Sequence, residues 1–461
     1  MRFKRIRLFS SQKFRTGIAA LILVLFAFFT SFTSPQLLHT AQSATPEEPG
    51  EILAEPTSRI YDPTTQRSHR VADLNKGSKN GLAPKAGITT TDSSQTVGQL
   101  SSRAPSGYSP SQIRRAYEID ELRVTGKGQI IAIVNAFHYP TAAADLSKFI
   151  KTFGLRQMYG LPGRAPCTVA AGPHPCFEVV YAQGEQPDFD EGWAFESAID
   201  TQWAHAIAPG ADILLVETPS NQLFDMLLGV DFAVSQGASV VSMSWGVSEI
   251  AAEMLFDHHF DHAGVVFVAG SGDTGNPGMY PAASPFVVAV GGTKLFLDRY
   301  GNRIKAETAW SGSGGGISIA EPEPSYQFTF PIPNTFGFRG YPDVAYLADP
   351  ATGIAVYDSA GYLGHTGWFI TGGTSIGAPQ WAGLIALANQ LRHGQNLSSN
   401  DVINSPLYDA ALADYRENYF DIRSGSNGSC GAVCKATKGY DFVTGLGSPR
   451  AEGLVKQLAD K

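Results

Sequence analysis

Short runs of Val, Ile, Leu and Ala alternate along the chain with segments whose apolar residues recur at helical spacing. Continuous apolar runs are typical of strands buried on both faces of a sheet, and their alternation with helices is typical of parallel strands. The runs occupy 129–137, 177–182, 211–217, 240–246, 265–271 and 287–293, and helical patterns occupy 141–153, 223–236, 251–262 and the stretch around 195–205. The pattern predicts an α/β fold with a mostly parallel central sheet and helices on both faces, with ligand sites at the carboxyl ends of the strands.

The first 44 residues differ from the rest in composition. They contain six basic residues and no acidic one, and the apolar run IAALILVLFAFF follows at 18–29. A basic start followed by an apolar run of this length is typical of a secretory signal peptide. The run is long for a cleaved signal and short for a membrane span, so an uncleaved N-terminal anchor is the alternative. We therefore expect a protein that is secreted, periplasmic or anchored to a membrane.

The segment 45–106 is rich in Pro, Ser, Thr, Gly and charge and lacks sustained apolar periodicity. This composition predicts a disordered linker or a residual propeptide. The remainder, 107–461, has the length of one large domain with a sizeable core.

The net charge of the chain limits the partners that we expect it to bind. The formal net charge is -8, and loss of the six basic residues of the first 44 would take it to -14. An acidic exported chain argues against a nucleic-acid partner. We expect a monomer that contacts a membrane only if the N-terminal segment is retained.

The four cysteines form two close sequence pairs. Cys167 lies near Cys176, and Cys430 lies near Cys434. In an exported protein this spacing favours two local disulfides, although three pairings are open. A zinc site is the alternative, but the spacing fits no zinc template and no histidine lies beside either pair.

A glycine turn that leads into a helix is the first candidate for chemistry. The run GGTSIGAPQWAGLIALANQ places Ser375 after Gly372 and Gly373, at the start of an apolar helical pattern. Free N–H groups at a helix start favour the negative charge that develops in acyl transfer. The same pattern also describes an ordinary N-cap. A serine nucleophile requires a base within hydrogen-bonding reach.

Histidine and carboxylate are the two candidates for that base. His205 is the best-placed histidine, followed by His258, His259 and His262, and none lies in a His-Gly-Thr setting. In FESAIDTQWAHAIAPGA, Glu196 and Asp200 lie four residues apart and share one helix face, whereas His205 points away from it.

Two carboxyls on adjacent turns repel each other, and in a desolvated cleft one of them keeps its proton. Glu196 can then take a proton from the serine while Asp200 positions it and shares the proton. The other interpretation is a pair of solvated acids, which the Ala, Phe, Ile and Trp residues of this helix disfavour.

A third carboxyl follows a buried strand in VVFVAGSGDTG, where Asp273 ends a Gly-Ser-Gly run. The common role of Asp beside Gly is to close its own turn with a side-chain hydrogen bond. A protonated Asp273 could instead donate a hydrogen bond to an oxyanion.

These motifs, ESAIDTQWAHAIAPGA, AGSGDTG and GGTSIGAP, together resemble the sedolisin family of serine-carboxyl peptidases over essentially all of 107–461. The resemblance implies a subtilisin-like fold with Ser375 as nucleophile, Glu196 as general base, Asp200 as its partner and Asp273 in the oxyanion hole. The activity implied is hydrolysis of peptide bonds in protein or peptide substrates, in acid, through an acyl-enzyme.

The C-terminal segment carries a candidate metal site. Asp421 and Asp441 bracket a loop rich in Gly, Ser and Asn, and carboxylates with turn carbonyls suit calcium. Asp in such loops commonly caps turns, and the spacing is not that of an EF-hand. The family resemblance implies one structural calcium ion, held by both Asp residues and by the backbone carbonyls of Ile422, Thr437 and Gly439.

The chain departs from the family pattern at two places. Only about 60 polar residues separate the predicted signal from the domain, where the family carries a long folded prodomain. Asn135-Ala136-Phe137 occupies the region where some members add a further Glu. An inactive peptide-binding relative, a tripeptidyl exopeptidase and a neutral-pH hydrolase that uses histidine are the competing functions.

Overall fold

The computed structural model describes residues 52–62, 67–70, 101–102, 104–169, 171–398 and 404–460. The signal or anchor predicted over 1–44 lies outside these ranges. Within them, no helix is long and apolar enough to cross a bilayer.

An eight-stranded sheet forms the centre of the domain, with strand order β13-β12-β10-β8-β5-β7-β6 and β16 paired to β12. All of its pairs are parallel except β12 with β13. The strands are β5 (Ile130–Ala136), β6 (Phe177–Tyr181), β7 (Asp212–Thr218), β8 (Val240–Met243), β10 (Val266–Gly270), β12 (Val287–Lys294), β13 (Thr308–Ala309) and β16 (Val344–Leu347). The predicted α/β fold with a mostly parallel sheet is confirmed.

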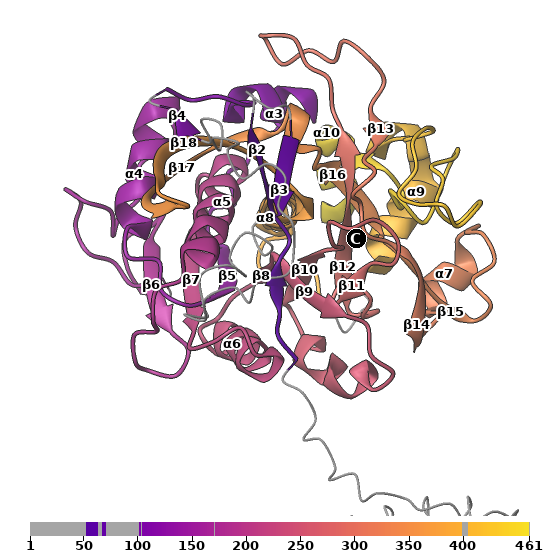
Figure 1. The fold of residues 1–461 in the computed structure, drawn as a ribbon, viewed down its shortest axis with the longest axis horizontal. Helices are drawn as coiled ribbons and strands as arrows, with labels where there is room; N and C mark the ends of the chain where they lie inside the picture. The colour runs from indigo at the N-terminus through magenta and orange to yellow at the C-terminus, as the bar shows by residue number, and fades with distance from the viewer. Residues whose placement is uncertain are drawn as a thin grey trace, which may run out of the picture. The chain divides into compact units, whose positions relative to one another are not determined.

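Helices cover both faces of this sheet (Figure 1). One face packs against α4 (Ala142–Phe153), α5 (Glu191–Ile207), α8 (Gly377–Leu391) and α10 (Ala451–Ala459). The other face packs against α6 (Leu223–Ser235). The helix predicted over 251–262 is a 3-10 helix, η1 (Glu253–Phe260), beside α6. The remaining helices are α3 (Pro110–Ala116), α7 (Ser325–Thr329) and α9 (Asn404–Asn418).

Two adjacent helices, α5 and α8, are buried almost all round. Every residue of α5 from 192 to 207 is buried, as is every residue of α8 from 377 to 389. A helix that is apolar on all sides belongs in the interior of a large domain. Gly383 allows the close approach, because a Cβ there would lie 2.7 Å from the Cβ of Ile207. The Asp190 side chain caps α5 by accepting from the backbone N–H groups of Gly192 and Trp193.

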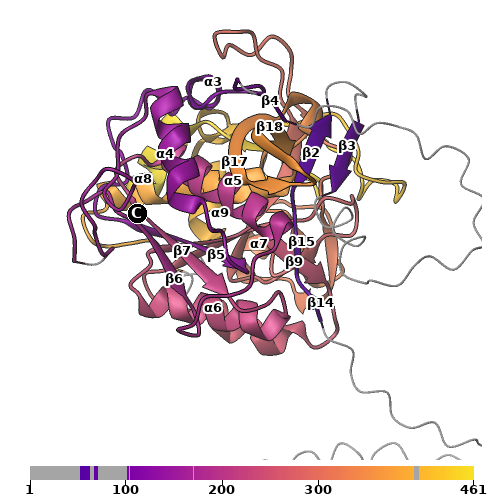
Figure 2. The same ribbon diagram turned by 60° about the vertical axis from the view of Figure 1, so that its left-hand side comes forward.

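Smaller sheets cover the carboxyl end of the central sheet. One contains β17 (Ile354–Tyr362), β18 (His365–Gly372), β2 (Arg59–Asp62), β3 (Arg67–Arg70) and β4 (Ser101–Ser102), and another contains β1 (Glu55–Pro56), β9 (Trp245–Ser248) and β11 (Met279–Tyr280). Two-stranded ribbons pair β14 (Gly316–Pro322) with β15 (Phe338–Tyr341), and β19 (Tyr419–Phe420) with β20 (Ser448–Pro449). Figure 2 shows β2 and β3 beside β18.

The predicted disordered linker over 45–106 therefore needs a correction. Residues 52–62 and 67–70 are largely strand, and they lie in the small sheets rather than outside the fold. These residues are ordered because their backbones pair with β9 and β18. Backbone pairing of this kind does not require an apolar periodicity, so the sequence pattern did not predict it. The rest of 45–106, apart from 101–102 and 104–106, lies outside the described residues.

Candidate active site

Glu196 and Asp200 project from one face of α5, and both side chains are completely buried. Burial raises the pKa of Asp200 to about 7. Burial also raises the pKa of Glu196 well above its usual range, and the charge of Asp200 raises it further. The alternative of two solvated acids on a surface helix is therefore wrong. The pair has the electrostatics of two carboxyls that share a proton through the acid range.

Hydrogen bonds from two neighbouring strands orient Asp200. Ser244, between β8 and β9, donates its hydroxyl to Oδ1 at 2.7 Å, and Asn135 at the end of β5 donates its side-chain amide to Oδ2 at 3.0 Å. Both bonds favour the ionised form and lower the pKa of Asp200 against the effect of burial. Neither residue was assigned a role from the sequence. The one sequence signal was a polar residue inside an otherwise apolar strand pattern.

Ser375 lies in a single 3-10 turn, η3 (Thr374–Ile376), between the end of β18 and the start of α8. Gly373 has φ 101°, a left-handed conformation that favours glycine. No side-chain bond caps η3 or α8, so the N-cap interpretation of Ser375 is wrong. The Ser375 hydroxyl instead lies 3.3 Å from the carbonyl oxygen of Ser244, in the same turn that holds Asp200.

The Ser375 and Ser58 hydroxyls lower the pKa of Glu196 against the larger effect of burial, while neither Glu196 oxygen has a hydrogen-bond partner within the described residues. Ser375 belongs to the turn that packs against α5. The nucleophile candidate and the base candidate therefore meet in the buried space between α5 and η3.

Asp273 follows β10 and faces the same turn. Its Oδ1 accepts from the backbone nitrogen of Thr374 at 2.8 Å and from the Thr374 hydroxyl at 3.0 Å. A Cβ on Gly373 would lie 2.5 Å from Asp273 Oδ2. The Asp273 carboxyl thus accepts hydrogen bonds from the turn that contains Ser375, 101 residues away in sequence. The sequence had suggested a hydrogen bond within its own Gly-Ser-Gly-Asp turn.

The four predicted acid and serine positions therefore converge, and the histidines do not join them. His205 is buried and its Nε2 lies 2.7 Å from the carbonyl oxygen of Arg156. Burial lowers the pKa of His205 to about 4. His258 and His259 lie in η1, which packs against α6, and His259 contacts Asp231. The hydroxyl of Ser375 contacts the Thr57 hydroxyl and the Ser244 carbonyl oxygen, and none of these three histidines.

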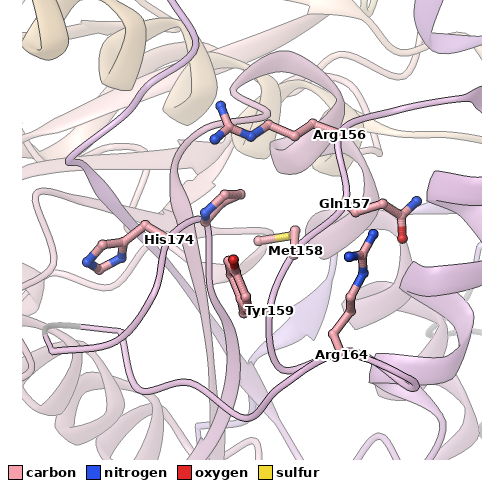
Figure 3. Close-up of a pocket in the computed structure, with 7 residues that line it drawn as sticks. Arg156, Gln157, Met158, Tyr159, Arg164 and His174 are labelled. Carbon is pink, nitrogen blue, oxygen red and sulfur yellow. The ribbon is translucent and has the colours of Figure 1, made fainter.

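A cavity of about 320 Å³ lies elsewhere, beside the carboxyl end of α5 (Figure 3). Its lining includes Arg156, Gln157, Met158, Arg164 and His174, with no serine and no carboxylate. His205, which bonds Arg156, is nine residues beyond Glu196, or about 13 Å along the helix axis. This cavity is not the candidate active site. The cleft beside Ser375 is filled by residues of the chain itself.

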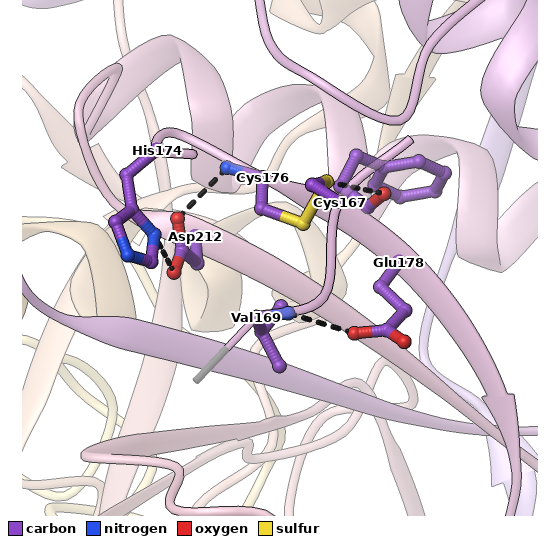
Figure 4. Close-up of a disulfide and its surroundings, with 7 residues drawn as sticks. Cys167, Val169, His174, Cys176, Glu178 and Asp212 are labelled. Atoms are coloured by element: carbon purple, nitrogen blue, oxygen red, sulfur yellow. Dashed lines mark hydrogen bonds and ion pairs between the residues drawn. A yellow bond between two sulfur atoms is a disulfide. The ribbon is translucent and has the colours of Figure 1, made fainter. Parts of the chain in front are cut away.

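Both predicted local disulfides form, Cys167 with Cys176 and Cys430 with Cys434. The zinc alternative is therefore wrong for these residues. Figure 4 shows the first bridge, which ties the loop before β6 to the sheet. Asp212 accepts from the backbone nitrogen of Cys176 at 2.8 Å and lies 2.7 Å from Nδ1 of His174, which fixes the same loop.

The candidate calcium residues converge on one turn. The Asp421 Oδ1 accepts from the backbone nitrogen of Gly439 at 2.9 Å, and the Asp441 Oδ2 accepts from that of Thr437 at 3.0 Å. Asp421 also pairs with Arg423, whereas Asp441 is buried and contacts no Lys or Arg among the described residues. No group of three or more His, Cys, Asp or Glu side chains that could hold a metal occurs in the described ranges.

The two carboxyls are oxygen ligands of the kind that a hard cation takes, and both accept from backbone N–H groups of the turn at 437–439. The two Asp residues face one turn, and Ile422 beside Asp421 is buried. A buried carboxylate without a cationic side chain is the kind of group that an ion would compensate.

Comparison with known proteins agrees with this site. The model of the subtilase family matches residues 192–431, a range that contains Glu196, Asp200, Asp273 and Ser375. The chain belongs to the subtilase family.

The sequence relatives include members of the sedolisin family, which the motifs resemble. Kumamolisin of a Bacillus species is 33% identical over 391 residues, which are 77% of this chain and 64% of kumamolisin. Tripeptidyl-peptidase 1 of Dictyostelium discoideum is 30% identical over 299 residues, which are 57% of this chain and 46% of that protein. The chain thus spans less than two thirds of the length of these relatives.

A solved structure shares the fold. Pseudomonas sedolisin, a serine-carboxyl proteinase complexed with two molecules of pseudo-iodotyrostatin, has a TM-score of 0.64 and 23% identity. The match covers 78% of this chain and 99% of that structure. The predicted subtilisin-like fold is confirmed.

Proposed function

We propose that this chain is a serine-carboxyl endopeptidase that hydrolyses peptide bonds in acid through an acyl-enzyme on Ser375. The observation that carries the proposal is the convergence of two buried carboxyls, Glu196 and Asp200, with a serine that follows a left-handed glycine and with a third carboxyl, Asp273. Membership of the subtilase family supports the same reaction class.

In this proposal Glu196 is the general base. Glu196 takes the Ser375 proton as Oγ attacks the substrate carbonyl carbon, and later returns it to the leaving amine. Asp200 holds a proton during this step, which removes the repulsion between the two carboxyls. The charge of Asp200 is one of the causes that raise the pKa of Glu196, so a neutral Asp200 makes Glu196 easier to ionise.

The oxyanion that forms needs donors near Ser375. The backbone nitrogen of Ser375 and a protonated Asp273 would supply them. Two bonds from Thr374 hold Oδ1 of Asp273, while Oδ2 faces Gly373 and lies 3.8 Å from the Nε of Arg59, whose charge favours the ionised carboxyl. The site requires protons on Asp200 and Asp273, so it works in acid and stops as the pH rises.

A tripeptidyl exopeptidase would close the cleft three residues before the cleaved bond. Within the described residues, the segment on the amino side of position 58 continues past the third residue, with pairing at 55–56 to β9 and a bond between Ile52 and Leu223. A cleft that remains open past the third residue favours endopeptidase activity. Mass spectrometry of products from a denatured protein separates the two modes, since tripeptides released only from the amino end would support the exopeptidase.

The deciding experiment is a pH-rate profile on denatured casein. We expect activity confined to acid in the wild type and abolished in Ser375→Ala and Glu196→Gln. Undiminished activity of Glu196→Gln, or a maximum near pH 7 to 8, would contradict the mechanism, and absence of activity in a folded wild type would support the inactive relative.

We further propose that Asp421 and Asp441, with the carbonyls of Ile422, Thr437 and Gly439, hold one calcium ion. The ion would neutralise the buried Asp441 and the partly exposed Asp421, and would fix the loop that precedes α10. Its role is structural, and no step of the reaction needs it.

We also propose that the protein acts outside the cytoplasm as a monomer. The basic and apolar start of the chain and the two disulfides support export, because disulfides persist in oxidising compartments. Expression with and without 1–44, followed by fractionation and gel filtration, tests both parts.

A further inference from the structure

The cavity of about 320 Å³ lies at the amino ends of β6 and β7 (Figure 3). His174 and Pro175, which line it, directly precede β6, and the side chain of Asp212, the first residue of β7, lies 2.7 Å from the His174 ring. Asp273 follows the carboxyl end of β10, at the opposite edge of the same parallel sheet. The cavity is therefore a site separate from the candidate active site.

Two arginines in the lining have no partner for their charge. Neither the Arg156 nor the Arg164 guanidinium forms a hydrogen bond or an ion pair with another described residue, and the lining contains no carboxylate. Acidic residues outnumber Lys and Arg in the chain, 42 to 34, and Arg303 and Arg339 both pair with carboxylates. The cavity thus carries positive charge that the described part of the protein does not neutralise.

The charge of Arg156 acts on the interior of the domain. His205, on the buried helix α5, has its Nε2 2.7 Å from the Arg156 carbonyl oxygen. Burial lowers the pKa of His205 to about 4, and the positive charge of Arg156 contributes to the lowering. A cation without a counter-ion has this effect on a neighbouring base, and a bound anion would oppose it.

The backbone around the cavity is fixed by the chain itself. The Tyr159 nitrogen donates to the Pro175 carbonyl oxygen at 2.9 Å, and the Phe177 nitrogen donates to the Tyr159 carbonyl oxygen at 3.0 Å. The disulfide between Cys167 and Cys176 closes the loop that contains Pro175 (Figure 4). A site whose backbone is already ordered loses less conformational freedom when a ligand binds.

The remaining lining residues combine a polar donor with apolar surface. Figure 3 shows Met158 and Tyr159 at the centre, with Arg156, Arg164 and His174 on different sides of them. The Tyr159 hydroxyl can donate a hydrogen bond, whereas the Met158 side chain is apolar. A ligand over this centre would therefore meet cationic groups around it and an apolar side chain beside the phenol.

Phosphate is the anion that suits these donors. Planar guanidinium groups bind phosphate and carboxylate oxygens through paired hydrogen bonds. A phosphate monoester has three terminal oxygens and a second pKa of about 6, so it accepts from several donors and keeps a charge in acid. A carboxylate has two oxygens and an ordinary pKa of about 4, so it loses its charge in the range where we propose that this protein acts.

The size of the cavity limits the ligand to a small molecule. Ligand sites commonly have volumes of about 300–1,000 Å³, and this cavity is at the lower end of that range. We propose that the cavity binds a small organic phosphate. Arg156 and Arg164 hold the phosphate oxygens, the Tyr159 hydroxyl is a further donor, and the organic part contacts Met158. The inference takes only the acid range from the proposed function.

Isothermal titration calorimetry of the full chain at constant ionic strength tests the site, with phenyl phosphate as the probe. We expect one saturable site. Inorganic phosphate, which lacks the organic group, and benzoate, which carries a carboxylate instead, should bind more weakly. A hydrogen bond to a charged group contributes a factor of about 10–100 in affinity, so Arg156→Gln and Arg164→Gln should each weaken binding by about this factor. The double variant should show no saturable binding.

Arg123→Gln is the matched control. Arg123 is exposed and lies outside the lining, so its replacement removes the same charge from the surface and should leave the affinity unchanged. Both arginines of the cavity are also exposed, so all of these variants should fold, which thermal melting checks.

The titration of His205 reports where the probe binds. A negative charge beside Arg156 favours the protonated imidazole, so saturating phenyl phosphate should raise the pKa of His205 measured by NMR. Arg156→Gln should raise this pKa without the probe, and Arg123→Gln should not.

Several results would overturn the inference. These are absence of saturable binding, binding that survives in the double variant, and equal weakening in Arg123→Gln. Benzoate that binds as tightly as phenyl phosphate would contradict the phosphate class, and binding to phosphatidylglycerol vesicles without binding of phenyl phosphate would indicate a lipid surface instead. A chain that binds phenyl phosphate at this site but hydrolyses no casein would overturn the peptidase proposal and leave this inference standing.

Discussion

Ser244 donates its hydroxyl proton to Asp200 across 2.7 Å, and its carbonyl oxygen lies 3.3 Å from the hydroxyl of Ser375. One residue between β8 and β9 therefore contacts both the carboxyl partner and the candidate nucleophile. A buried carboxylate keeps a lower pKa with each donor it retains. Removing this donor should change the pH range in which the enzyme works.

We predict that Ser244→Ala shifts the upper limb of the pH-rate profile to higher pH. In the wild type this limb should lie near the Asp200 pKa of about 7, because loss of that proton places a second charge beside Glu196. A bond to a charged group is worth about 1.5–3 kcal/mol, or roughly one to two pKa units. Ser242→Ala is the control, since its buried hydroxyl has no partner among the described residues. An unmoved limb in Ser244→Ala would contradict the assignment.

Replacement of the proposed catalytic groups should lower kcat with little effect on folding. Loss of a general base costs about 10²–10⁴-fold, and loss of an oxyanion donor about 10²–10³-fold. We therefore expect Glu196→Gln to be the more damaged variant and Asp273→Asn the less damaged one. Glu191→Gln, on the first turn of the same helix, should keep near-normal kcat. The kcat of all three variants is measured at acid pH with an internally quenched fluorogenic peptide as substrate.

Gly373 combines a left-handed backbone with a crowded Cβ position. Gly373→Ala would place a methyl group 2.4 Å from the Thr57 carbonyl oxygen and 2.5 Å from Asp273 Oδ2, so we expect loss of peptidase activity. Gly364→Ala is the matched control. Gly364 has φ 76° and no atom within 4 Å of its Cβ position. Its replacement by Ala therefore introduces an unfavourable left-handed backbone conformation but no steric clash. Equal activity losses in both variants would argue against a role for the space beside Gly373.

A second group of buried acids should make the fold more stable in acid. Burial raises the pKa of Glu253 to about 8 and that of Glu321 to about 9. Burial also raises the pKa of Asp257, and the charges of Asp257 and Glu253 add to the rise at Glu321, while the charge of Arg339 opposes it. These carboxyls prefer to be neutral in the folded state.

The sign of the effect follows from comparing folded and unfolded chains. The folded pKa values lie above the unfolded values of about 4.3, so the unfolded chain releases these protons first as the pH rises. Stability is full below about pH 4 and falls up to about pH 9. We expect the wild-type melting temperature to drop by several degrees over this range, and Glu321→Gln to show a smaller drop. A pH-independent melting temperature would contradict the buried positions of these acids.

Removal of calcium should destabilise the C-terminal loop. A chelator should lower the melting temperature, and added Ca²⁺ should restore it, because an ion that binds only the folded state stabilises that state. Asp441→Asn should abolish the response. Asp298→Asn, in an exposed loop where Asp298 accepts from Tyr300 and Asn302, should keep it. A melting temperature that a chelator leaves unchanged would oppose a structural ion.

The sequence predicted those features of the fold that depend on residues close to one another along the chain. Apolar runs predicted the strands of the central sheet, because a strand buried on both faces has mostly apolar positions. Spacing of four residues placed Glu196 and Asp200 on one helix face, and glycines marked the turn at Ser375. These features depend on neighbours within a few residues.

The hydrogen-bond partners of the acids could not be predicted in this way. Asn135 and Asp200 are 65 residues apart, and Ser244 and Asp200 are 44 apart. The pairing of β5 with β8 and the packing of α5 against β5 bring them together, and a polar residue in an apolar run does not indicate which residue it will contact. The same holds for Asp273, whose bond to Thr374 replaced the local turn expected from its sequence.

Residues 52–62 mark the clearest boundary between the two kinds of information. By itself the sequence determined the central sheet, the buried helices, the candidate nucleophile and its carboxyl partners. The tertiary structure alone decided that a polar stretch without periodicity becomes a strand and brings Thr57 to Ser375. The physical reason is that its hydrogen bonds come from the backbones of β9, β18 and the segment at 221–223, and backbone groups leave no pattern in the side chains.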